Sequence, residues 1–132
     1  MRKTVLVLLF VAGLLPLTAT KGQKRPSPTP PCGKYDTQAE AGECAYKEYQ
    51  AADAELNKAY NQLAAQLDAD GRTHLKEAEL AWISYRDKNC EYESSFYLGG
   101  TMRPMIESFC LARMTKARSA ELREQLRFQR EQ

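Results

Sequence analysis

Apolar side chains recur at steps of three and four residues along much of this chain, which is the period of an amphipathic helix. The first such stripe runs through Ala45, Tyr49, Ala52, Leu56, Ala59, Tyr60, Leu63 and Leu67. Thr37 and Glu40 precede it at the spacing of a capping box, in which each side chain accepts a hydrogen bond from the backbone N–H of the other residue. The pattern therefore predicts one long first helix that starts after Thr37.

Two further stripes predict a second and a third helix. The second passes through Leu75, Ala78, Trp82, Arg86 and Cys90 and ends near Gly99-Gly100, and the third passes through Ile106, Phe109, Cys110, Met114, Ala117, Leu122 and Leu126. Asp68-Ala69-Asp70-Gly71 supplies turn residues between the first two helices, and Pro104 suits the first turn of the third. No segment alternates apolar and polar residues for long enough to predict a strand. We therefore expect residues 32–132 to form an all-α domain, a three-helix antiparallel bundle.

Residues 1–31 lack this helical pattern and carry other signals. Met1-Arg2-Lys3 and the apolar run at residues 5–17 predict a secretory signal peptide over residues 1–19, and cleavage after Gly22 is the alternative. The apolar run is shorter than the about 20 residues that span a bilayer, so we expect membrane contact only through the signal peptide before its cleavage. Residues 20–31 (TKGQKRPSPTPP) predict a proline-rich disordered linker. The mature protein is therefore expected to be periplasmic or secreted.

The four cysteines fit export, because disulfides form and persist in oxidising compartments. If the second and third helices fold back around Gly100, Cys90 and Cys110 lie level on adjacent helices. This register selects Cys90–Cys110 and Cys32–Cys44 from the three ways of pairing four cysteines. We therefore expect two disulfides, the second of which would join the end of the linker to the start of the first helix.

Charge and composition exclude several classes of function. The chain has 19 basic and 17 acidic residues, and the part from Cys32 onward has fourteen and seventeen, a net charge of −3 that lacks the dense basic patch of nucleic-acid binding. His74 is the only histidine and has no recognisable Ser or Cys nucleophile, so we expect no enzyme and no catalytic residues. The chain has no CxxC motif and no phosphate-binding loop, so we expect neither a metal nor a small-molecule cofactor.

Two motifs on the first two predicted helices are recognisable. They are Asp53-x-x-Leu56-Asn57-x-x-Tyr60 and Trp82-x-x-Tyr85-Arg86-Asp87-x-x-Cys90, accompanied by Cys32, Thr37-Gln38, Cys44, Tyr49, Leu75-Lys76-x-Ala78, Gly99-Gly100-Thr101, Cys110 and Thr115-x-x-Arg118-x-x-Glu121-Leu122. Together they resemble the lysozyme inhibitor LprI family over about residues 32–126. The resemblance implies a small, helical, disulfide-bonded bacterial export protein that inhibits lysozyme. The chain differs from the founding lipoprotein of the family in lacking the lipid-attachment cysteine.

We expect most of these motif residues to serve the fold. Folding the first two helices back around Asp70-Gly71 places Asp53 beside Arg86 and predicts an ion pair between them. The expected structural network comprises Asp53, Asn57, Tyr60, Trp82, Tyr85, Arg86 and Asp87, with its aromatic members on packed faces. The alternative is that its polar members form a recognition patch. The acidic pairs Glu77/Glu79 and Glu91/Glu93 are interpreted as solvated surface.

The candidate lysozyme-binding element is the loop at residues 94–103 (SSFYLGGTMR), both ends of which a Cys90–Cys110 bridge would hold. Its candidate contact residues are Phe96, Tyr97, Gly99, Gly100, Thr101 and Arg103. The other interpretation of this loop is a plain connection between helices. Residues 34–93, with thirteen acidic and seven basic side chains, offer a second candidate face for a basic partner. The sequence therefore leaves two alternative functions: a stoichiometric inhibitor of a c-type lysozyme, and a binding or scaffolding module for another envelope protein.

Overall fold

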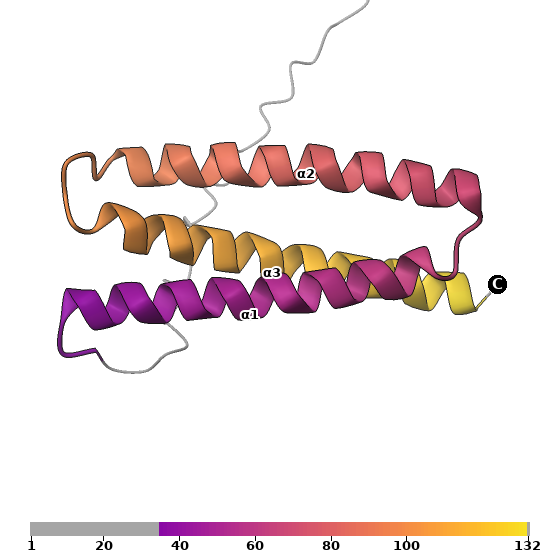
Figure 1. Cartoon of the computed structure of the whole chain (residues 1–132), viewed down its shortest axis with the longest axis horizontal. Helices are drawn as coiled ribbons and strands as arrows, with labels where there is room; N and C mark the ends of the chain where they lie inside the picture. Colours follow the sequence, from indigo (N-terminus) through magenta and orange to yellow (C-terminus); the bar gives the residue numbers. More distant parts are fainter. Residues whose placement is uncertain (1–34, 132) are drawn as a thin grey trace, which may run out of the picture.

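The computed structural model describes residues 35–131, and three long helices account for nearly all of them (Figure 1). They are α1 (Gln38–Ala64), α2 (Ala69–Ser95) and α3 (Arg103–Arg130). The described residues contain no strand, so the predicted all-α fold of three helices is confirmed. The signal peptide expected at residues 1–19, the linker expected at residues 20–31 and Cys32 lie outside the described residues.

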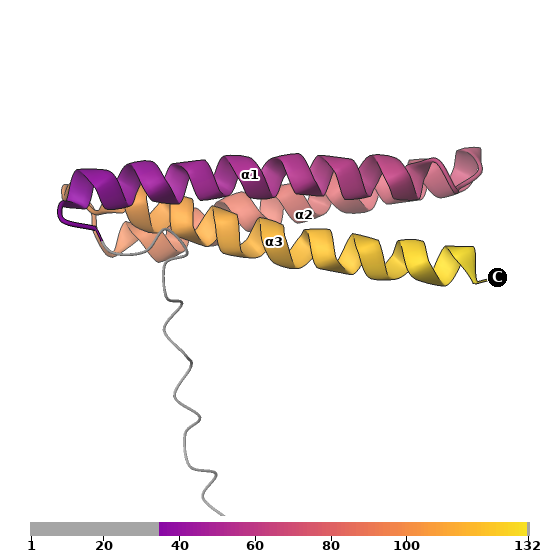
Figure 2. The ribbon, with the colours of Figure 1, turned by 90° about the horizontal axis from the view of Figure 1, so that it is seen from below.

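The three helices lie side by side along the long axis of the bundle, with α1 and α3 running in the same direction and α2 in the opposite one (Figure 1, Figure 2). The backbone of α3 lies closest to that of α1, whereas α1 and α2 approach each other closely at few points. Small side chains explain the close approach, since the distance between helix axes depends on the residues at the contact. The small buried residues are Ala41, Ala45, Ala52 and Ala59 of α1 and Ala112, Thr115 and Ser119 of α3.

The apolar core lies in the half of the bundle nearer to the α1–α2 connection. It consists of Leu56, Ala59, Leu63, Leu75, Leu122 and Leu126, with Tyr60, Ala64, Leu67 and Trp82 packed against it. Each buried leucine contributes about 1.5–3 kcal/mol to the free energy of unfolding. Toward the other end the buried residues are smaller, namely Ala41, Ala45, Cys90, Ser94, Cys110 and Ala112. That end therefore depends more on the disulfide and on polar contacts.

The start of α1 agrees with the sequence prediction. Thr37 Oγ1 accepts a hydrogen bond from the Glu40 N–H at 3.2 Å, and Glu40 Oε2 accepts one from the Thr37 N–H at 3.1 Å. These two bonds satisfy backbone donors that the first turn of a helix otherwise leaves without partners. The predicted capping box is confirmed.

The connection between α1 and α2 differs from the prediction. Asp68 is the N-cap of α2, and its Oδ1 accepts a hydrogen bond from the Gly71 N–H at 2.8 Å. Asp70 and Gly71 therefore belong to the first turn of α2, and the prediction of a turn there was wrong because aspartate favours helix N-caps as well as turns. A Cβ atom at position 71 would lie 3.0 Å from Asp68 Oδ1, which explains a glycine inside this helix.

The buried faces of α2 and α3 also differ in part from the apolar stripes. Glu79 is buried in α2 where Ala78 was expected, and Thr115 and Ser119 are buried in α3 where Ala117 was expected. Each of these polar side chains has a bonding partner, as buried polar groups normally do. A pattern of apolar residues alone does not locate buried positions of this kind.

The connection between α2 and α3 agrees with the prediction. Residues 96–102 link the two helices, and Pro104 lies in the first turn of α3. Cys90 and Cys110 form the expected disulfide, with their Cα atoms 5.5 Å apart. Cys44 is also disulfide-bonded, but its predicted partner lies outside the described residues, so the Cys32–Cys44 bridge stays a prediction. None of the helices within residues 35–131 has an apolar stretch long enough to cross a bilayer.

Candidate functional site

The loop at residues 96–102 lies at the end of the bundle where α1 begins (Figure 1). Gly99 has a φ of 76°, in the left-handed region that glycine adopts far more readily than other residues. A Cβ atom there would meet nothing within 4 Å, so the backbone conformation, and not lack of space, favours glycine. The Gly100 N–H donates to the Tyr97 carbonyl at 3.0 Å and closes a tight turn. The backbone of this loop is therefore held in one shape.

Large apolar side chains gather on this loop and remain in solvent. Phe96 is 71% exposed and Leu98 is 69% exposed, and the ring of Phe96 packs edge-on against that of Tyr92 with 5.3 Å between centroids. We call this surface the loop patch, and it comprises Tyr92, Phe96, Tyr97, Leu98 and Met102. Large exposed apolar surfaces commonly mark interaction sites, so the loop patch is the first candidate for one.

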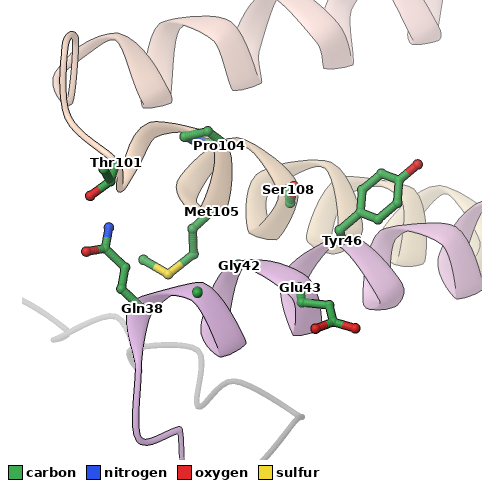
Figure 3. Close-up of a pocket in the computed structure, with 9 residues that line it drawn as sticks. Gln38, Gly42, Glu43, Tyr46, Thr101, Pro104, Met105 and Ser108 are labelled. Carbon is green, nitrogen blue, oxygen red and sulfur yellow. The ribbon is translucent and has the colours of Figure 1, made fainter.

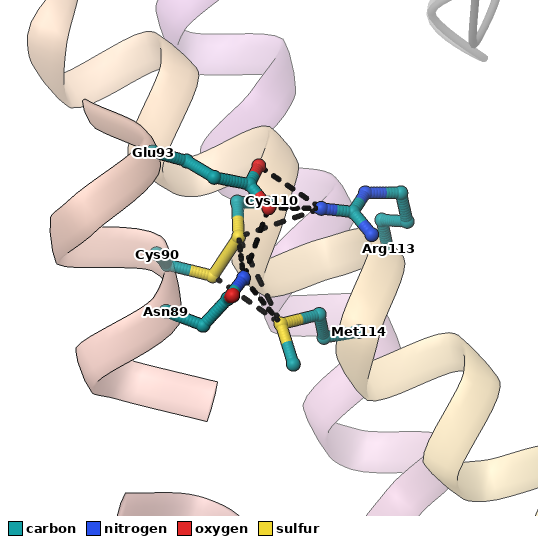
Figure 4. Close-up of polar contacts among 6 residues, drawn as sticks. All are labelled: Asn89, Cys90, Glu93, Cys110, Arg113 and Met114. Atoms are coloured by element: carbon teal, nitrogen blue, oxygen red, sulfur yellow. Dashed lines mark hydrogen bonds and ion pairs between the residues drawn. A yellow bond between two sulfur atoms is a disulfide. The ribbon is translucent and has the colours of Figure 1, made fainter. Parts of the chain in front are cut away.

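Several contacts join the end of α2 to the first half of α3 (Figure 4). The Cys90–Cys110 disulfide joins the two helices, and Arg113 Nη2 donates to the two carboxylate oxygens of Glu93 at 2.8 and 3.0 Å. Asn89 Nδ2 lies 3.3 Å from Met114 Sδ beside the disulfide. A loop whose two ends are tied together in this way loses little conformational freedom when it binds a partner.

A groove of about 610 Å³ opens at the same end, between the first turns of α1 and α3 (Figure 3). It is lined by Gln38, Ala39, Gly42, Glu43, Tyr46, Thr101, Pro104, Met105 and Ser108. Thr101 belongs to the loop, so the groove adjoins the loop. No local sequence pattern indicates this groove, because it forms between residues about 60 positions apart in the chain.

The structure brings most, but not all, of the predicted loop residues to one surface. Phe96 and Tyr97 are exposed on the loop, and Thr101 lies at the edge of the groove. Arg103 is instead half-buried at the first position of α3, where it lines a separate polar depression with Arg86 and Glu107. Arg103 is therefore directed to a different part of the surface from the loop patch.

The predicted network residue Arg86 is buried, with 6% of its surface exposed. Its Nε and Nη2 lie 2.9 and 2.8 Å from Asp87 Oδ1, and its Nη1 donates to Thr115 Oγ1 at 3.3 Å. Its Cζ lies 5.2 Å from the centroid of Trp82 and 5.5 Å from that of Tyr49, within the range of cation–π attraction. Arg86 thus joins all three helices.

The predicted ion pair between Asp53 and Arg86 is not formed. Asp53 Oδ2 instead accepts a hydrogen bond from Asn57 Nδ2 at 3.0 Å, one turn along α1. The cause is the position of the connection between α1 and α2, which lies about one helical turn before the predicted turn. In the structure the ring of Tyr49, one turn before Asp53, therefore lies beside the Arg86 guanidinium.

Glu79 and Arg118 form a buried ion pair that the sequence pattern does not predict. Glu79, interpreted as solvated surface, is buried and accepts a hydrogen bond from Arg118 Nε at 2.9 Å, and Arg118 also donates to Glu121 at 3.0 Å. Burial disfavours the charged form of Arg118, but these hydrogen bonds and charges outweigh burial and raise its pKa above the ordinary value. The spacing of Glu79 from Leu75 and Trp82, four and three residues, was the available signal.

The aromatic members of the predicted network differ in burial. Trp82 and Tyr60 are half-buried against the core, as expected. Tyr85 is 60% exposed, so its placement on a packed face was wrong. Trp82 and Arg86 already occupy the side of α2 that faces α3, and Tyr85 lies outside it. Arg118 Cζ lies 5.8 Å from the centroid of the Trp82 ring, so this indole is within cation–π range of two guanidinium groups, those of Arg86 and Arg118.

Within residues 35–131 no group of three or more His, Cys, Asp or Glu side chains is placed to hold a metal ion. His74, the only histidine, is an exposed residue near the start of α2, 4.0 Å from Glu77. The features that stand out are an exposed apolar loop, the groove beside it and the internal polar network.

Comparisons with known proteins agree with this fold. Residues 31–122 match the family model described as "Lysozyme inhibitor LprI". The chain is 39% identical over 121 residues to "Uncharacterized protein R02472" of Rhizobium meliloti (strain 1021), an alignment that covers 82% of this chain and 87% of that protein. It is also similar to the crystal structure of a DUF1311 family protein from Pseudomonas putida KT2440, with a TM-score of 0.64, 25% identity and coverage of 68% of this chain and 94% of the other.

Proposed function

The chain belongs to the lysozyme inhibitor LprI family, and from this membership we propose that it is an exported, non-catalytic inhibitor that binds a c-type lysozyme one to one. The signal peptide expected at residues 1–19 and the linker expected at residues 20–31 would deliver the helical domain to the periplasm or the medium. There the four cysteines would be oxidised, as Cys44, Cys90 and Cys110 are in the structure.

The observation that carries this proposal is the loop patch. Phe96 and Leu98 extend from a loop that a disulfide and the Glu93–Arg113 ion pair hold at its base. Aromatic residues and methionine are enriched in protein interfaces, and the loop patch presents three aromatic rings and one methionine. The adjoining groove could take a side chain of the partner, which would extend the contact from the loop to the start of α1.

The mode of inhibition is steric. A lysozyme cleaves a glycan chain held in an open cleft between two carboxyl groups, so a narrow protein loop that enters or covers this cleft excludes the substrate. No bond is made or broken in either protein. Because the loop is already ordered, its binding does not have to overcome the entropy of folding the loop, and a small surface can give useful affinity.

Charge supports the encounter with a basic enzyme. Residues 34–93 have thirteen acidic and seven basic side chains, and they include α1 and most of α2. An acidic surface attracts a cationic protein over distances of about 10 Å at 0.1 M salt and raises the association rate. Raising the salt concentration is therefore expected to slow association more than it speeds dissociation.

Replacing Phe96 with alanine is expected to weaken the binding of lysozyme by at least about tenfold, the scale of an interface hot spot. The matched control is Phe128→Ala at the opposite end of α3, because Phe128 is 62% exposed but remote from the loop. Surface plasmon resonance on immobilised lysozyme measures both dissociation constants, and circular dichroism confirms equal helix content.

Two results would contradict this proposal, the first for the loop as the site and the second for lysozyme as the partner. If wild-type protein binds lysozyme and both variants bind equally well, the contact lies elsewhere, with the acidic α1–α2 face as the next candidate. If the oxidised wild-type protein does not bind lysozyme at all, the alternative function, a binding or scaffolding module for another envelope protein, is favoured.

A further inference from the structure

Tyr85 is the residue of the motif at residues 82–87 that the fold does not explain. Arg86 and Asp87 bond each other, and Trp82 lies against the guanidinium of Arg86. The side chain of Tyr85 is 60% exposed, and among residues 35–131 neither its ring nor its hydroxyl has a partner. Neither the packing of the bundle nor its polar network therefore requires a tyrosine at this position.

Tyr85 belongs to a row of exposed side chains along α2. Lys88 and Tyr92 follow it at three and seven residues, which places all three on one face of the helix. Tyr92 is 64% exposed, and Phe96, one turn further on, is 71% exposed. The buried Cys90 lies on the other side of the helix. We call Tyr85, Lys88, Tyr92 and Phe96 the α2 ridge, which is about 16 Å long at the rise of an α-helix.

The α2 ridge is accessible because α2 forms one edge of the bundle (Figure 1). α2 packs mainly against α3 and approaches α1 closely at few points. Tyr92 and Phe96 also belong to the loop patch, so the ridge continues that surface without a break. A straight row of side chains along one edge of a molecule fits a concave surface on a partner.

The loop patch is small for a complete interface. Its five large side chains are each 39–71% exposed, which amounts to roughly 600 Å² if such a side chain can bury about 200 Å². A specific protein interface of standard size buries about 800 Å² on each partner. The α2 ridge adds apolar surface directly beside the patch and brings the total close to that size.

Lys88 gives the ridge a charge opposite to that of its surroundings. It is exposed, and it forms no ion pair within the described part of the chain. The carboxylate of Asp87 is bonded to Arg86, and Glu91 is not paired with Lys88. Residues 34–93 are otherwise acidic, with thirteen acidic and seven basic side chains. A lysozyme has the reverse arrangement, because its cleft holds two carboxyl groups in a basic protein.

We propose that the α2 ridge enters the substrate cleft of the lysozyme together with the loop patch, with the Lys88 ammonium group opposite the carboxyl groups of the cleft. The row of aromatic side chains then occupies the path of the glycan chain. This inference rests on the proposed lysozyme function. It adds the helix face that fills the cleft and the residue that recognises its carboxyl groups.

The test measures dissociation constants of the oxidised mature protein and its variants on immobilised c-type lysozyme. Tyr85→Ala and Lys88→Gln should each weaken binding about fivefold, and circular dichroism should show unchanged helix content. The sign of the Lys88 effect is diagnostic. Removing a cation makes the protein more acidic, so general attraction to a basic enzyme would strengthen binding and not weaken it.

Two control variants match these substitutions. Lys58→Gln removes the same charge from an exposed position on α1, outside the ridge. Leu80→Ala truncates an apolar side chain of α2 that is 57% exposed but does not belong to the ridge. Neither variant should weaken the binding of lysozyme.

A lysozyme whose two cleft carboxyl groups are replaced by amides tests the pairing of Lys88 directly. The wild-type protein and Lys88→Gln should bind this lysozyme equally well, because the partner of the ammonium group is gone. If Lys88→Gln still loses about fivefold in affinity, Lys88 contacts another part of the enzyme and the proposed pairing is wrong.

Three further outcomes would overturn the inference. If Phe96→Ala weakens binding but Tyr85→Ala and Lys88→Gln do not, the loop alone is the site, and the proposed function stands without the ridge. If the wild-type protein does not bind lysozyme, the proposed function and the inference fall together. If sedimentation shows a dimer that Tyr85→Ala dissociates, the ridge binds a second copy of this chain instead.

Discussion

Replacing Arg86 with alanine is expected to lower the free energy of unfolding by about 2–4 kcal/mol. Arg86 is buried, bonds Asp87 and Thr115, and lies against the rings of Tyr49 and Trp82. The substitution removes a link between three helices and leaves the Thr115 hydroxyl and two aromatic faces without their neighbour. Urea unfolding followed by circular dichroism measures the change.

The control for this prediction is Arg123→Ala on α3. Arg123 is exposed, and its contact with Glu55 is long, at 3.9 Å, so its removal should change the unfolding free energy by less than about 0.5 kcal/mol. If Arg86→Ala costs less than about 1 kcal/mol, the side chain is dispensable for the fold, and its motif position would have to be explained by recognition instead.

Removing the Cys90–Cys110 disulfide by the double substitution to alanine is expected to destabilise the domain by about 3 kcal/mol. The bridge closes a chain segment with a sequence separation of 20 and lies in the half of the bundle with the smaller buried side chains. Substitution is preferable to a reducing agent because Cys44 is also disulfide-bonded and would be reduced as well. Thermal and urea unfolding measure the loss of stability.

The same double variant separates stability from binding. At a temperature where it remains folded, we expect its affinity for lysozyme to fall as well, because the loop at residues 96–102 is no longer tied at its base. A folded variant with wild-type affinity would show that the bridge serves stability alone. A change of less than about 1 kcal/mol in unfolding free energy would show that the Glu93–Arg113 ion pair and the packing suffice.

The elements that the sequence predicted correctly are those with local signals. The capping box at Thr37 and Glu40, the helical stripes and the Gly99-Gly100 connection all depend on residues close together in the chain. The Cys90–Cys110 pair followed from that connection, because a correct turn position sets the register of both helices it joins.

The error in the register of α1 and α2 originates in an aspartate with two possible roles. Asp68 caps α2, but a sequence of the form Asp68-x-x-Gly71 is equally typical of a turn. Placing the turn there moved the predicted connection by about one helical turn and put Asp53 at the level of Arg86 in the predicted hairpin. Buried polar positions were the other difficulty. The buried Glu79 forms an ion pair with Arg118, which lies 39 positions further along the chain. A pattern of apolar residues cannot show such a pairing.

The candidate site could be predicted only in outline. The loop was located from its sequence, but the exposure of Leu98, the groove beside Thr101 and the separate position of Arg103 depend on how three helix ends meet.

The most direct test of the proposed function is a turbidity assay of cell-wall lysis by a c-type lysozyme in the presence of the oxidised mature protein. We expect the lysis rate to fall as the protein is added and to reach its minimum at a one-to-one molar ratio, with both proteins recovered chemically unchanged. Undiminished lysis at a micromolar excess of folded, oxidised protein would contradict the proposal.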